Sequence, residues 1–236
     1  MAQLTGAERA HYVQNLFTRI AGRYDVMNRL MTFGQDTHWR ARVVELAQVP
    51  AGGRVLDLGT GTGDIAFALA HRTPTAQVVG GDFTLAMMRV GQRRQDGQRL
   101  SWSGTDALNL PFPDATFDAV VSGYLMRNVG DLKRAWAEQW RVLKPGGRVV
   151  CLDTTPPARN LLRPFIEFHL HTVIPTLGQL MTGAREAYTY LPNSTEGFLS
   201  AEKLAEQMEV AGFESVSFER WMLGTMAIHS AMKPAA

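Results

Sequence analysis

The residues whose types and spacing best suit chemistry lie in a glycine-rich run after an apolar segment. The run from Asp57 to Asp64 reads DLGTGTGD. Glycines at the end of a strand let the backbone turn sharply and approach a ligand closely. The first N–H groups of a helix that follows can bind an anionic group. The run therefore predicts a cofactor-binding turn between a strand and a helix.

The spacing of these glycines separates two classes of cofactor. A dinucleotide-binding turn has the pattern G-x-G-x-x-G, whereas this run alternates as G-x-G-x-G and has Asp64 at the position of the third glycine. S-adenosylmethionine presents an α-amino group that suits the carboxylate of Asp57, and an α-carboxylate that suits helix N–H groups. The spacing favours this methyl donor. A nicotinamide-dependent oxidoreductase is the alternative from another class.

Two more acidic residues follow the next two expected strands. Asp82 ends a strand near 77–81, where a carboxylate can accept hydrogen bonds from both ribose hydroxyls. Asp106 follows a short strand near 100–103, where its side chain can reach an adenine amino group. The structural alternatives are a helix cap at Asp82 and a turn at Asp106. Three acidic residues after three successive strands favour an adenosine-containing cofactor over coincidence.

The elements that must position these residues alternate between strands and helices. Strands are expected at 54–58, 77–81, 100–103, 117–122, 148–153, 213–220 and 225–232, and helices near 64–71, from 84, at 131–143 and at 200–211. The continuous apolar run 117–122 is typical of a strand buried on both faces. The alternation predicts an α/β fold with a doubly wound, mostly parallel, Rossmann-like sheet and right-handed crossovers.

Two helical segments interrupt this alternation. Residues 12–48 carry apolar side chains at helical spacing, so residues 1–48 are expected to form a helical lid. Residues 157–186 are helical and apolar and fall between two expected strands, which predicts an insertion packed over the sheet edge. No repeat or low-complexity linker is visible, so residues 1–236 are expected to form a single domain.

Composition excludes several other classes of protein. The net charge of +2 gives no strong field for nucleic acid. No apolar run is as long as a membrane span, and the N-terminus has no apolar core of signal-peptide type. The single cysteine, Cys151, cannot form an internal disulfide, which suits the cytoplasm. No group of His, Cys and Asp has metal-ligand spacing, so no metal is expected.

The residues around the glycine turn resemble a known family. The stretch YDVMNRLMTFG from Tyr24 to Gly34, followed by Trp39, resembles the first signature of the UbiE/MenG family of quinone-biosynthesis C-methyltransferases. The stretch RVLKPGG at 141–147 resembles its second signature. Arg127-Asn128-Val129 and the YTYLPNS stretch at 188–194 also match. The resemblance runs from about residue 12 to the C-terminus.

This resemblance implies a class I methyltransferase fold, with S-adenosylmethionine as cofactor and S-adenosylhomocysteine as product. The expected cofactor-binding residues are Asp57, Gly59, Gly61, Thr62, Asp82, Phe83, Asp106, Ala107 and Gly123. Some relatives carry a serine at the position of Gly123, so only a backbone contact is expected there.

The reaction implied by the family is methylation of a ring carbon in a prenylated quinol. The expected acceptor is demethylmenaquinol, which becomes menaquinol; the alternative is a 2-methoxy-6-polyprenyl-benzoquinol of ubiquinone biosynthesis. Loss of a proton from the ring hydroxyl pushes charge onto the neighbouring carbon, which attacks the methyl in line. The protein must align the two, exclude water and favour the quinolate. The apolar tail would bring the enzyme transiently to the inner membrane face.

Three residues are expected to act on the acceptor. Arg127 would stabilise the phenolate and lower its pKa, Asn128 would orient Arg127 or the substrate oxygen, and Tyr24 would complete a relay to a water that acts as base. The alternative is an ordinary loop at Arg127-Asn128. His169 and His171 are rival bases, but two residues apart on a helix they point to different faces.

Two short stretches depart from the family pattern near the expected substrate pocket. Tyr124-Leu125-Met126 replaces the more usual Gly-Leu pair, and the sequence at 152–155 is LDTT rather than a Leu-Glu-Phe run. These departures bear on the substrate more than on the cofactor. The segment 157–186 is either one wall of a groove for the isoprenoid tail or a helix pair that packs in the core.

Overall fold

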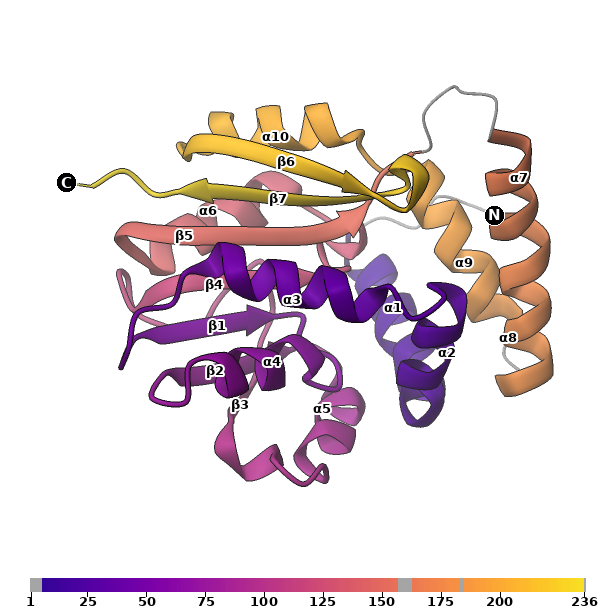
Figure 1. Ribbon diagram of the computed structural model, residues 1–236, viewed down its shortest axis with the longest axis horizontal. Helices are drawn as coiled ribbons and strands as arrows, with labels where there is room; N and C mark the ends of the chain where they lie inside the picture. The colour runs from indigo at the N-terminus through magenta and orange to yellow at the C-terminus, as the bar shows by residue number, and fades with distance from the viewer. Residues whose placement is uncertain (1–5, 157–162, 183–184, 236) are drawn as a thin grey trace.

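A computed structural model describes residues 6–156, 163–182 and 185–235, which build one seven-stranded sheet with helices on both faces (Figure 1). The strands are β1 Arg54–Leu58, β2 Gln77–Asp82, β3 Ser101–Gly104, β4 Phe117–Gly123, β5 Leu143–Thr154, β6 Glu214–Trp221 and β7 Met226–Met232. Their order is β3-β2-β1-β4-β5-β7-β6. The first five run parallel, and β7 is antiparallel to both of its neighbours. The predicted doubly wound, mostly parallel sheet is confirmed.

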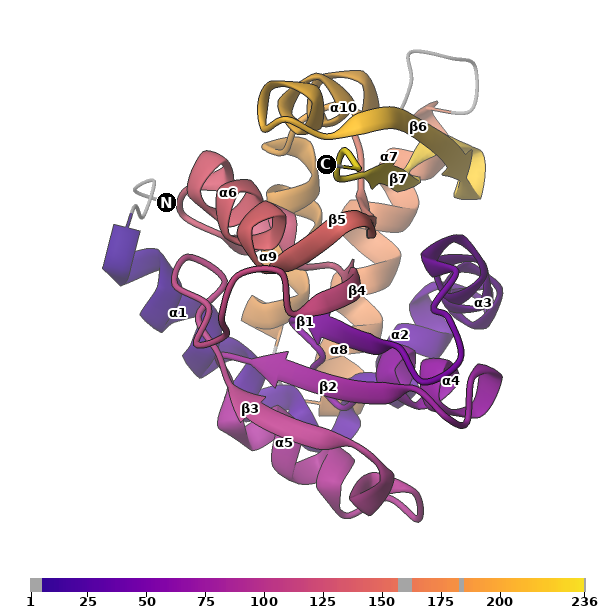
Figure 2. The same ribbon diagram turned by 90° about the vertical axis from the view of Figure 1, so that its left-hand side faces the viewer.

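Helices cover the two faces of the sheet. The covering helices are α3 Asp36–Ala47, α4 Asp64–Arg72, α5 Leu85–Gln92, α6 Leu132–Val142 and α10 Ala201–Val210. Trp39 of α3 and Phe67 of α4 pack in the core on one face. Trp136 of α6 and Met208 of α10 pack in the core on the other. Figure 2 shows the sheet between α3 and α4 on one side and α6 and α10 on the other.

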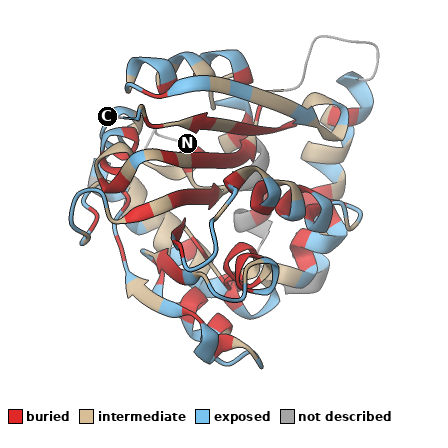
Figure 3. Ribbon diagram, turned by 60° about the vertical axis from the view of Figure 1, so that its left-hand side comes forward, coloured by how far each residue is buried: buried red, intermediate tan, exposed pale blue. Residues whose placement is uncertain are grey.

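The central strands are buried on both faces, as the apolar run in β4 predicts (Figure 3). Successive side chains of a strand point to opposite faces. Val55 of β1 therefore lies in the α3–α4 core, and Leu56 lies in the α6–α10 core. Full burial of such a side chain contributes about 1.5–3 kcal/mol. The two cores fix the sheet and hence the positions at which its strands end.

The remaining helices gather beyond the carboxyl ends of the parallel strands (Figure 1). They are α1 Gly6–Ile20, α2 Tyr24–Met31, α7 Arg163–Phe168, α8 Ile174–Thr182 and α9 Arg185–Glu196, with a π-helical turn His169–Val173 between α7 and α8. Leu16 and Met27 of the N-terminal helices share a buried cluster with Ile174 and Tyr188. The later helices thus pack on α1 and α2 rather than over the sheet edge. Leu161 and Leu162 of the expected insertion, and residues 1–5 of the expected lid, lie outside the described residues, and the lid role stays a prediction.

The start of β5 differs from the expected strand at 148–153. The pairing of β4 with β5 begins at Phe117 with Leu143 and resumes at Ala119 with Arg148 after a register shift. The Lys144-Pro-Gly-Gly segment is therefore a bulge within the strand, because Gly146 takes a φ of +74° and lets the chain loop out and return to the ladder. None of the described helices has both the length and the apolar character needed to span a membrane.

Candidate active site

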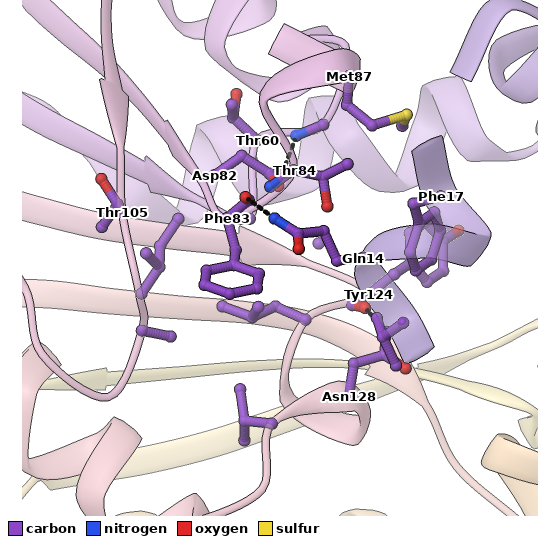
Figure 4. A pocket seen from close by; sticks show the side chains of 18 of the residues that line it. Gln14, Phe17, Thr60, Asp82, Phe83, Thr84, Met87, Thr105, Tyr124 and Asn128 are labelled. Atoms are coloured by element: carbon purple, nitrogen blue, oxygen red, sulfur yellow. Dashed lines mark hydrogen bonds between the residues drawn. The ribbon is translucent and has the colours of Figure 1, made fainter. Parts of the chain in front are cut away.

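A cavity of about 520 Å³ lies at the carboxyl ends of the parallel strands. Its volume is in the range of about 300–1,000 Å³ that is usual for small-molecule sites. The loops after β1, β2, β3 and β4 line it, and Gln14 and Phe17 of α1 cover it. Figure 4 shows Gln14 close to Phe83, and Tyr124 close to Asn128. The cavity spans the point where neighbouring strands β1 and β4 lead to opposite halves of the sheet, which is where such sheets bind ligands.

The glycine turn after β1 requires its glycines. Gly59, Gly61 and Gly63 have φ values of +72°, +58° and +88°, a region that side chains disfavour. A Cβ on Gly59 would lie 3.0 Å from Leu125 Cδ1, and one on Gly63 would lie 2.8 Å from a ring carbon of Trp102. The turn therefore brings its backbone close to the cavity, with α4 beginning directly after it.

Asp57 supplies a carboxylate oxygen that no described residue satisfies. The side chain is buried, and its Oδ2 accepts hydrogen bonds from Thr60 Oγ1 at 2.7 Å and from the Ala66 N–H at 3.0 Å. Its Oδ1 has no hydrogen-bond partner among the described residues. Burial raises the pKa of Asp57 to about 7. A cationic donor in the cavity would satisfy Oδ1, so this residue fits the ammonium group of an amino-acid moiety.

Asp82 joins two of the cavity loops. Its Oδ2 accepts a hydrogen bond from the Gly61 N–H at 2.7 Å, and its Oδ1 accepts one from the Thr84 N–H at 2.6 Å. Burial raises the pKa of Asp82. A carboxylate has about four lone-pair sites, so each oxygen can still accept a hydroxyl hydrogen bond. The cap role and a ribose-binding role are therefore compatible in this residue.

The loop after β3 lines the end of the cavity near Phe83. Asp106 is exposed, and its Oδ1 accepts a hydrogen bond from the Leu108 N–H at 2.9 Å, which is the turn expected as its structural alternative. Ala107 is buried beside it. The Phe83 carbonyl accepts a hydrogen bond from Gln14 Nε2 at 2.9 Å. Phe83, Ala107 and Asp106 all line the cavity. Two apolar side chains beside an exposed carboxylate suit an adenine ring and its amino group.

Thr62 and Gly123 complete the residues expected to bind the cofactor. The Thr62 hydroxyl donates to Asp25 Oδ1 of α2 at 2.6 Å, so its side chain fastens the turn to the N-terminal helices. Gly123 lines the cavity, and a Cβ there would lie 2.8 Å from Ile65 Cδ1. All nine residues predicted for the cofactor line the one cavity.

Tyr24 also lines the cavity. Burial raises its pKa to about 12, although Arg127 and Arg40 oppose that shift. The phenol is therefore protonated at neutral pH and is available to donate a hydrogen bond.

Arg127 lies behind the cavity lining rather than in it. The guanidinium of Arg127 forms an ion pair with Asp153 of β5 at 2.5 Å. The backbone N–H of Arg127 donates a hydrogen bond to the same carboxylate at 3.1 Å. Both side chains are buried. The guanidinium also lies 5.1 Å from the centre of the Tyr124 ring. Tyr124 therefore lies between the Arg127 guanidinium and the cavity. This arrangement does not support the predicted direct contact between Arg127 and the acceptor oxygen.

Asn128 lines the cavity but is held by two protein groups. Its Nδ2 donates to the Tyr124 carbonyl at 2.9 Å, and its Oδ1 accepts a hydrogen bond from the Tyr190 hydroxyl at 3.0 Å. Asn128 therefore fixes the turn after β4.

The cavity is also lined by polar residues that were not singled out from the sequence as site residues, among them Asn28, Arg40, Tyr124 and His11. Arg40 pairs with Asp36 at 2.9 Å and with Asp64 at 2.5 Å, which places a buried cation at the start of α4. The sequence offered one signal for Arg40, because it directly follows Trp39 of the first family signature. The departure from the family at 124–126 was the signal for Tyr124.

The rival histidines lie elsewhere. His169 Nε2 donates to the Met31 carbonyl at 3.2 Å, and His171 pairs with Glu196. Neither lines the cavity. Among the described residues, no group of three or more His, Cys, Asp or Glu side chains is arranged to hold a metal ion.

Comparison with known proteins gives a match over nearly the whole chain. The model of the ubiE/COQ5 methyltransferase family matches residues 5–233. A protein of Desulfotalea psychrophila, named ubiquinone/menaquinone biosynthesis C-methyltransferase UbiE, is 53% identical over 94% of this chain and 90% of its own length. A protein of Roseiflexus castenholzii, named demethylmenaquinone methyltransferase, is 43% identical over 96% of this chain and 95% of its own.

Solved structures share the architecture. The crystal structure of the [4+2]-cyclase SpnF superposes with a TM-score of 0.70 at 19% identity, covering 95% of this chain and 96% of that one. At this level of identity the likeness concerns the fold alone.

Proposed function

Because the chain belongs to the ubiE/COQ5 methyltransferase family, we propose that it transfers a methyl group from S-adenosylmethionine to a ring carbon of a prenylated quinol. The acceptor that we propose is demethylmenaquinol, and the product is menaquinol. The observation that carries the proposal is the similarity to named quinone-biosynthesis methyltransferases over nearly the full length of the chain. A methoxy-benzoquinol of ubiquinone biosynthesis is the second acceptor to test, since the Desulfotalea relative is named for both pathways.

The residues after the first three strands suit the cofactor. When bound, S-adenosylmethionine supplies an electrophilic methyl group on a sulfonium. The unsatisfied Oδ1 of Asp57 would accept from the ammonium group, and Asp82 would accept from the ribose hydroxyls. Phe83 and Ala107 would flank the adenine, with Asp106 at its amino edge. Gly59, Gly61, Thr62 and Gly123 would approach through the backbone.

The other cavity residues suit the acceptor. Tyr24 would donate a hydrogen bond to the acceptor at neutral pH, because its pKa of about 12 keeps the phenol protonated. Asn128 holds the turn after β4, and the Arg127–Asp153 pair supports it from behind. Phe17 lines the cavity from α1, and its apolar ring would exclude water from the bound acceptor, which strengthens these polar interactions. The three residues predicted to be catalytic thus take different parts: Tyr24 as a donor, Asn128 and Arg127 as positioning residues.

An apolar patch suits contact with a membrane that holds the prenylated substrate. Val26, Leu30 and Phe33 lie along one side of α2 and its end, and Phe165 and Phe168 lie on α7; all are exposed. The ring of Phe33 stacks on His169 at 5.3 Å, which joins the two groups. Exposed apolar clusters commonly mark interaction sites. We propose that these five residues, the apolar patch, touch the bilayer surface.

The direct test is methyl transfer in vitro. Purified protein is incubated with methyl-labelled S-adenosylmethionine and demethylmenaquinol under reducing conditions, and the lipid extract is analysed for label. Calorimetry with S-adenosylhomocysteine and with NADH separates the oxidoreductase alternative. Label in the quinol fraction and binding of S-adenosylhomocysteine alone are the expected results. Binding of NADH without S-adenosylhomocysteine would contradict the proposal.

A further inference from the structure

Two hydrogen-bond donors of the cavity lack any partner. The Tyr124 hydroxyl and the Asn28 Nδ2 are both shielded from solvent, and neither has a hydrogen-bond partner among the described residues. Both residues line the cavity. Unpaired buried donors are uncommon, because each has lost its bonds to water without a replacement. A ligand oxygen in the cavity would supply the missing acceptor.

The backbone at Tyr124 is held in a conformation that bulky residues disfavour. Tyr124 directly follows β4 and has a φ of +60°. Its N–H donates to the Leu152 carbonyl at 2.8 Å, and its own carbonyl accepts from Asn128 Nδ2 at 2.9 Å. Tyr190 in turn holds Asn128. Such strained residues persist where their surroundings fix them, and they gather at functional sites.

Two buried guanidinium groups lie near the Tyr124 phenol. The Arg127 guanidinium lies 5.1 Å from the centre of the Tyr124 ring. Arg40 lines the same cavity, and both guanidinium groups lower the pKa of the Tyr124 phenol, although burial outweighs them and raises it. The phenol is therefore protonated and can donate. Each guanidinium is already paired with carboxylates, Arg127 with Asp153 and Arg40 with Asp36 and Asp64. The preference for an anionic oxygen therefore comes from the two donors themselves, because hydrogen bonds to the charged form of a ligand group favour that form.

The topology separates Tyr124 from the three acidic residues proposed to bind the cofactor. Asp57 and Asp82 lie at the carboxyl ends of β1 and β2, and Asp106 lies just after β3, on one side of the switch point between β1 and β4. Tyr124 follows β4, on the other side. Two ligands that meet at the switch point would therefore divide between these halves, with the acceptor on the side of Tyr124.

From this arrangement we propose that the Tyr124 hydroxyl and Asn28 Nδ2 donate hydrogen bonds to the ring oxygen of the quinol, beside the carbon that is methylated. They hold that oxygen as the anion and set the orientation of the ring. This inference rests on the proposed function and names the residues that recognise its acceptor. It also accounts for an aromatic residue in a left-handed conformation at the end of β4.

The test uses 1-naphthol as a probe on protein saturated with S-adenosylhomocysteine. Calorimetry gives its affinity, and the naphtholate absorbance gives the pKa of the bound hydroxyl. Tyr124→Phe removes only one oxygen atom. It is expected to weaken naphthol binding about tenfold, the effect of one hydrogen bond to a charged group, and to raise the pKa of the bound naphthol. Asn28→Asp, which replaces the donor with an acceptor, is expected to do the same.

Thr154→Val is the matched control, because Thr154 Oγ1 is also buried without a partner but does not line the cavity. This variant should bind naphthol as the wild type does, and S-adenosylhomocysteine should bind equally to all four proteins. Unchanged naphthol affinity and pKa in Tyr124→Phe would overturn the inference. Loss of S-adenosylhomocysteine binding in that variant would also overturn it, since Tyr124 would then belong to the cofactor half.

The inference and the proposed function fail in different ways. If wild-type protein methylates a quinol but Tyr124→Phe binds naphthol normally, only the inference is wrong. If wild-type protein methylates neither quinol, the proposed function is wrong, whatever the probe shows. A wild type that does not bind naphthol contradicts the inference without touching the methyl-transfer result.

Discussion

The protonation of Asp57 controls how well the cavity holds a cation. Burial raises its pKa from 3.8 to about 7, so the side chain is largely neutral below pH 7 and ionised above it. An ammonium group is attracted only by the carboxylate. The affinity for S-adenosylhomocysteine should therefore fall about tenfold for each pH unit below about 7. Calorimetry between about pH 6 and about pH 8 measures this slope.

The raised pKa of Asp57 affects the stability of the free protein in the opposite direction: a rise in pH favours cofactor binding but disfavours folding. The folded state holds this proton more tightly than the unfolded chain does, so the contribution of Asp57 to folding stability is greatest below pH 3.8 and is lost as the pH rises through about 7.

Asp57→Asn should bind S-adenosylhomocysteine weakly, and its affinity should not depend on pH between about 6 and about 8. A wild-type affinity that does not change across the interval would show that Asp57 does not bind the ammonium group.

The Arg127–Asp153 pair predicts a large change in stability. Both charges are buried, and removal of one leaves the other without a partner. Arg127→Met should lower the free energy of unfolding by about 3–5 kcal/mol, measured by urea denaturation. The double variant Arg127→Met/Asp153→Leu removes both charges and should recover much of that loss. If the single variant is as stable as the wild type, Arg127 is not the structural support that its contacts indicate.

Single residues of the cofactor half were more predictable from sequence than those of the acceptor half. The positions of Asp57, Asp82 and Asp106 could be predicted because each lies at or just after the carboxyl end of a predicted strand, so local order along the chain fixes its place. Arg127 could not be placed, because its partner Asp153 comes from β5 and only the pairing of β4 with β5 brings the two together. The φ of +60° at Tyr124 has no signature in the sequence.

At the scale of elements, α1 and α2 are fastened to the cofactor loops by a few hydrogen bonds. Gln14 of α1 donates to the Phe83 carbonyl at 2.9 Å, and Asp25 of α2 accepts from Thr62 at 2.6 Å. Because α1 covers the cavity, its bonds are expected to slow the release of a bound cofactor. Gln14→Ala should speed S-adenosylhomocysteine dissociation several-fold, measured by stopped-flow fluorescence, with a change in stability of less than about 1 kcal/mol.

Asn15→Ala is the control for that variant, since Asn15 is exposed and is not part of the cavity lining. It removes an amide from the same helix and should leave the dissociation rate unchanged. Equal rates in Gln14→Ala and the wild type would mean that α1 does not restrain the ligand, which would remove the support for the predicted lid.

The arrangement of strands could be inferred from the alternation of apolar runs and turns, and the parallel order follows from the crossover helices. Three features of the fold could not be inferred from the sequence. The antiparallel direction of β7 depends on the short link from β6, the bulge in β5 depends on its pairing with β4, and the place of α8 depends on apolar contacts with α2. Each depends on contacts between distant segments, which spacing along one chain does not encode.

At the scale of the whole molecule, the apolar patch predicts binding to lipid surfaces. Phe33 and Phe168 are 72% and 60% exposed. The double variant Phe33→Ser/Phe168→Ser should reduce co-sedimentation with phosphatidylglycerol-containing vesicles several-fold, because less apolar area enters the interface. Its affinity for S-adenosylhomocysteine should not change.

Val210→Ser is the control for the patch, since Val210 is 77% exposed on α10, an element outside the patch. It should sediment with vesicles as the wild type does. If Phe33→Ser/Phe168→Ser and the wild type sediment equally, the patch does not contact the bilayer.

The chemistry of the whole enzyme is defined by the atom that receives the methyl group and by the quinol that carries this atom. Wild-type protein and Asp57→Asn are each given ¹³C-methyl S-adenosylmethionine with demethylmenaquinol or with a 2-methoxy-6-polyprenyl-benzoquinol, and the products are located by mass spectrometry and NMR. The predicted result is a labelled methyl group on the ring carbon of menaquinol, formed faster than any benzoquinol product and lost in Asp57→Asn. Label on a ring oxygen, or no label in either quinol, would contradict the account.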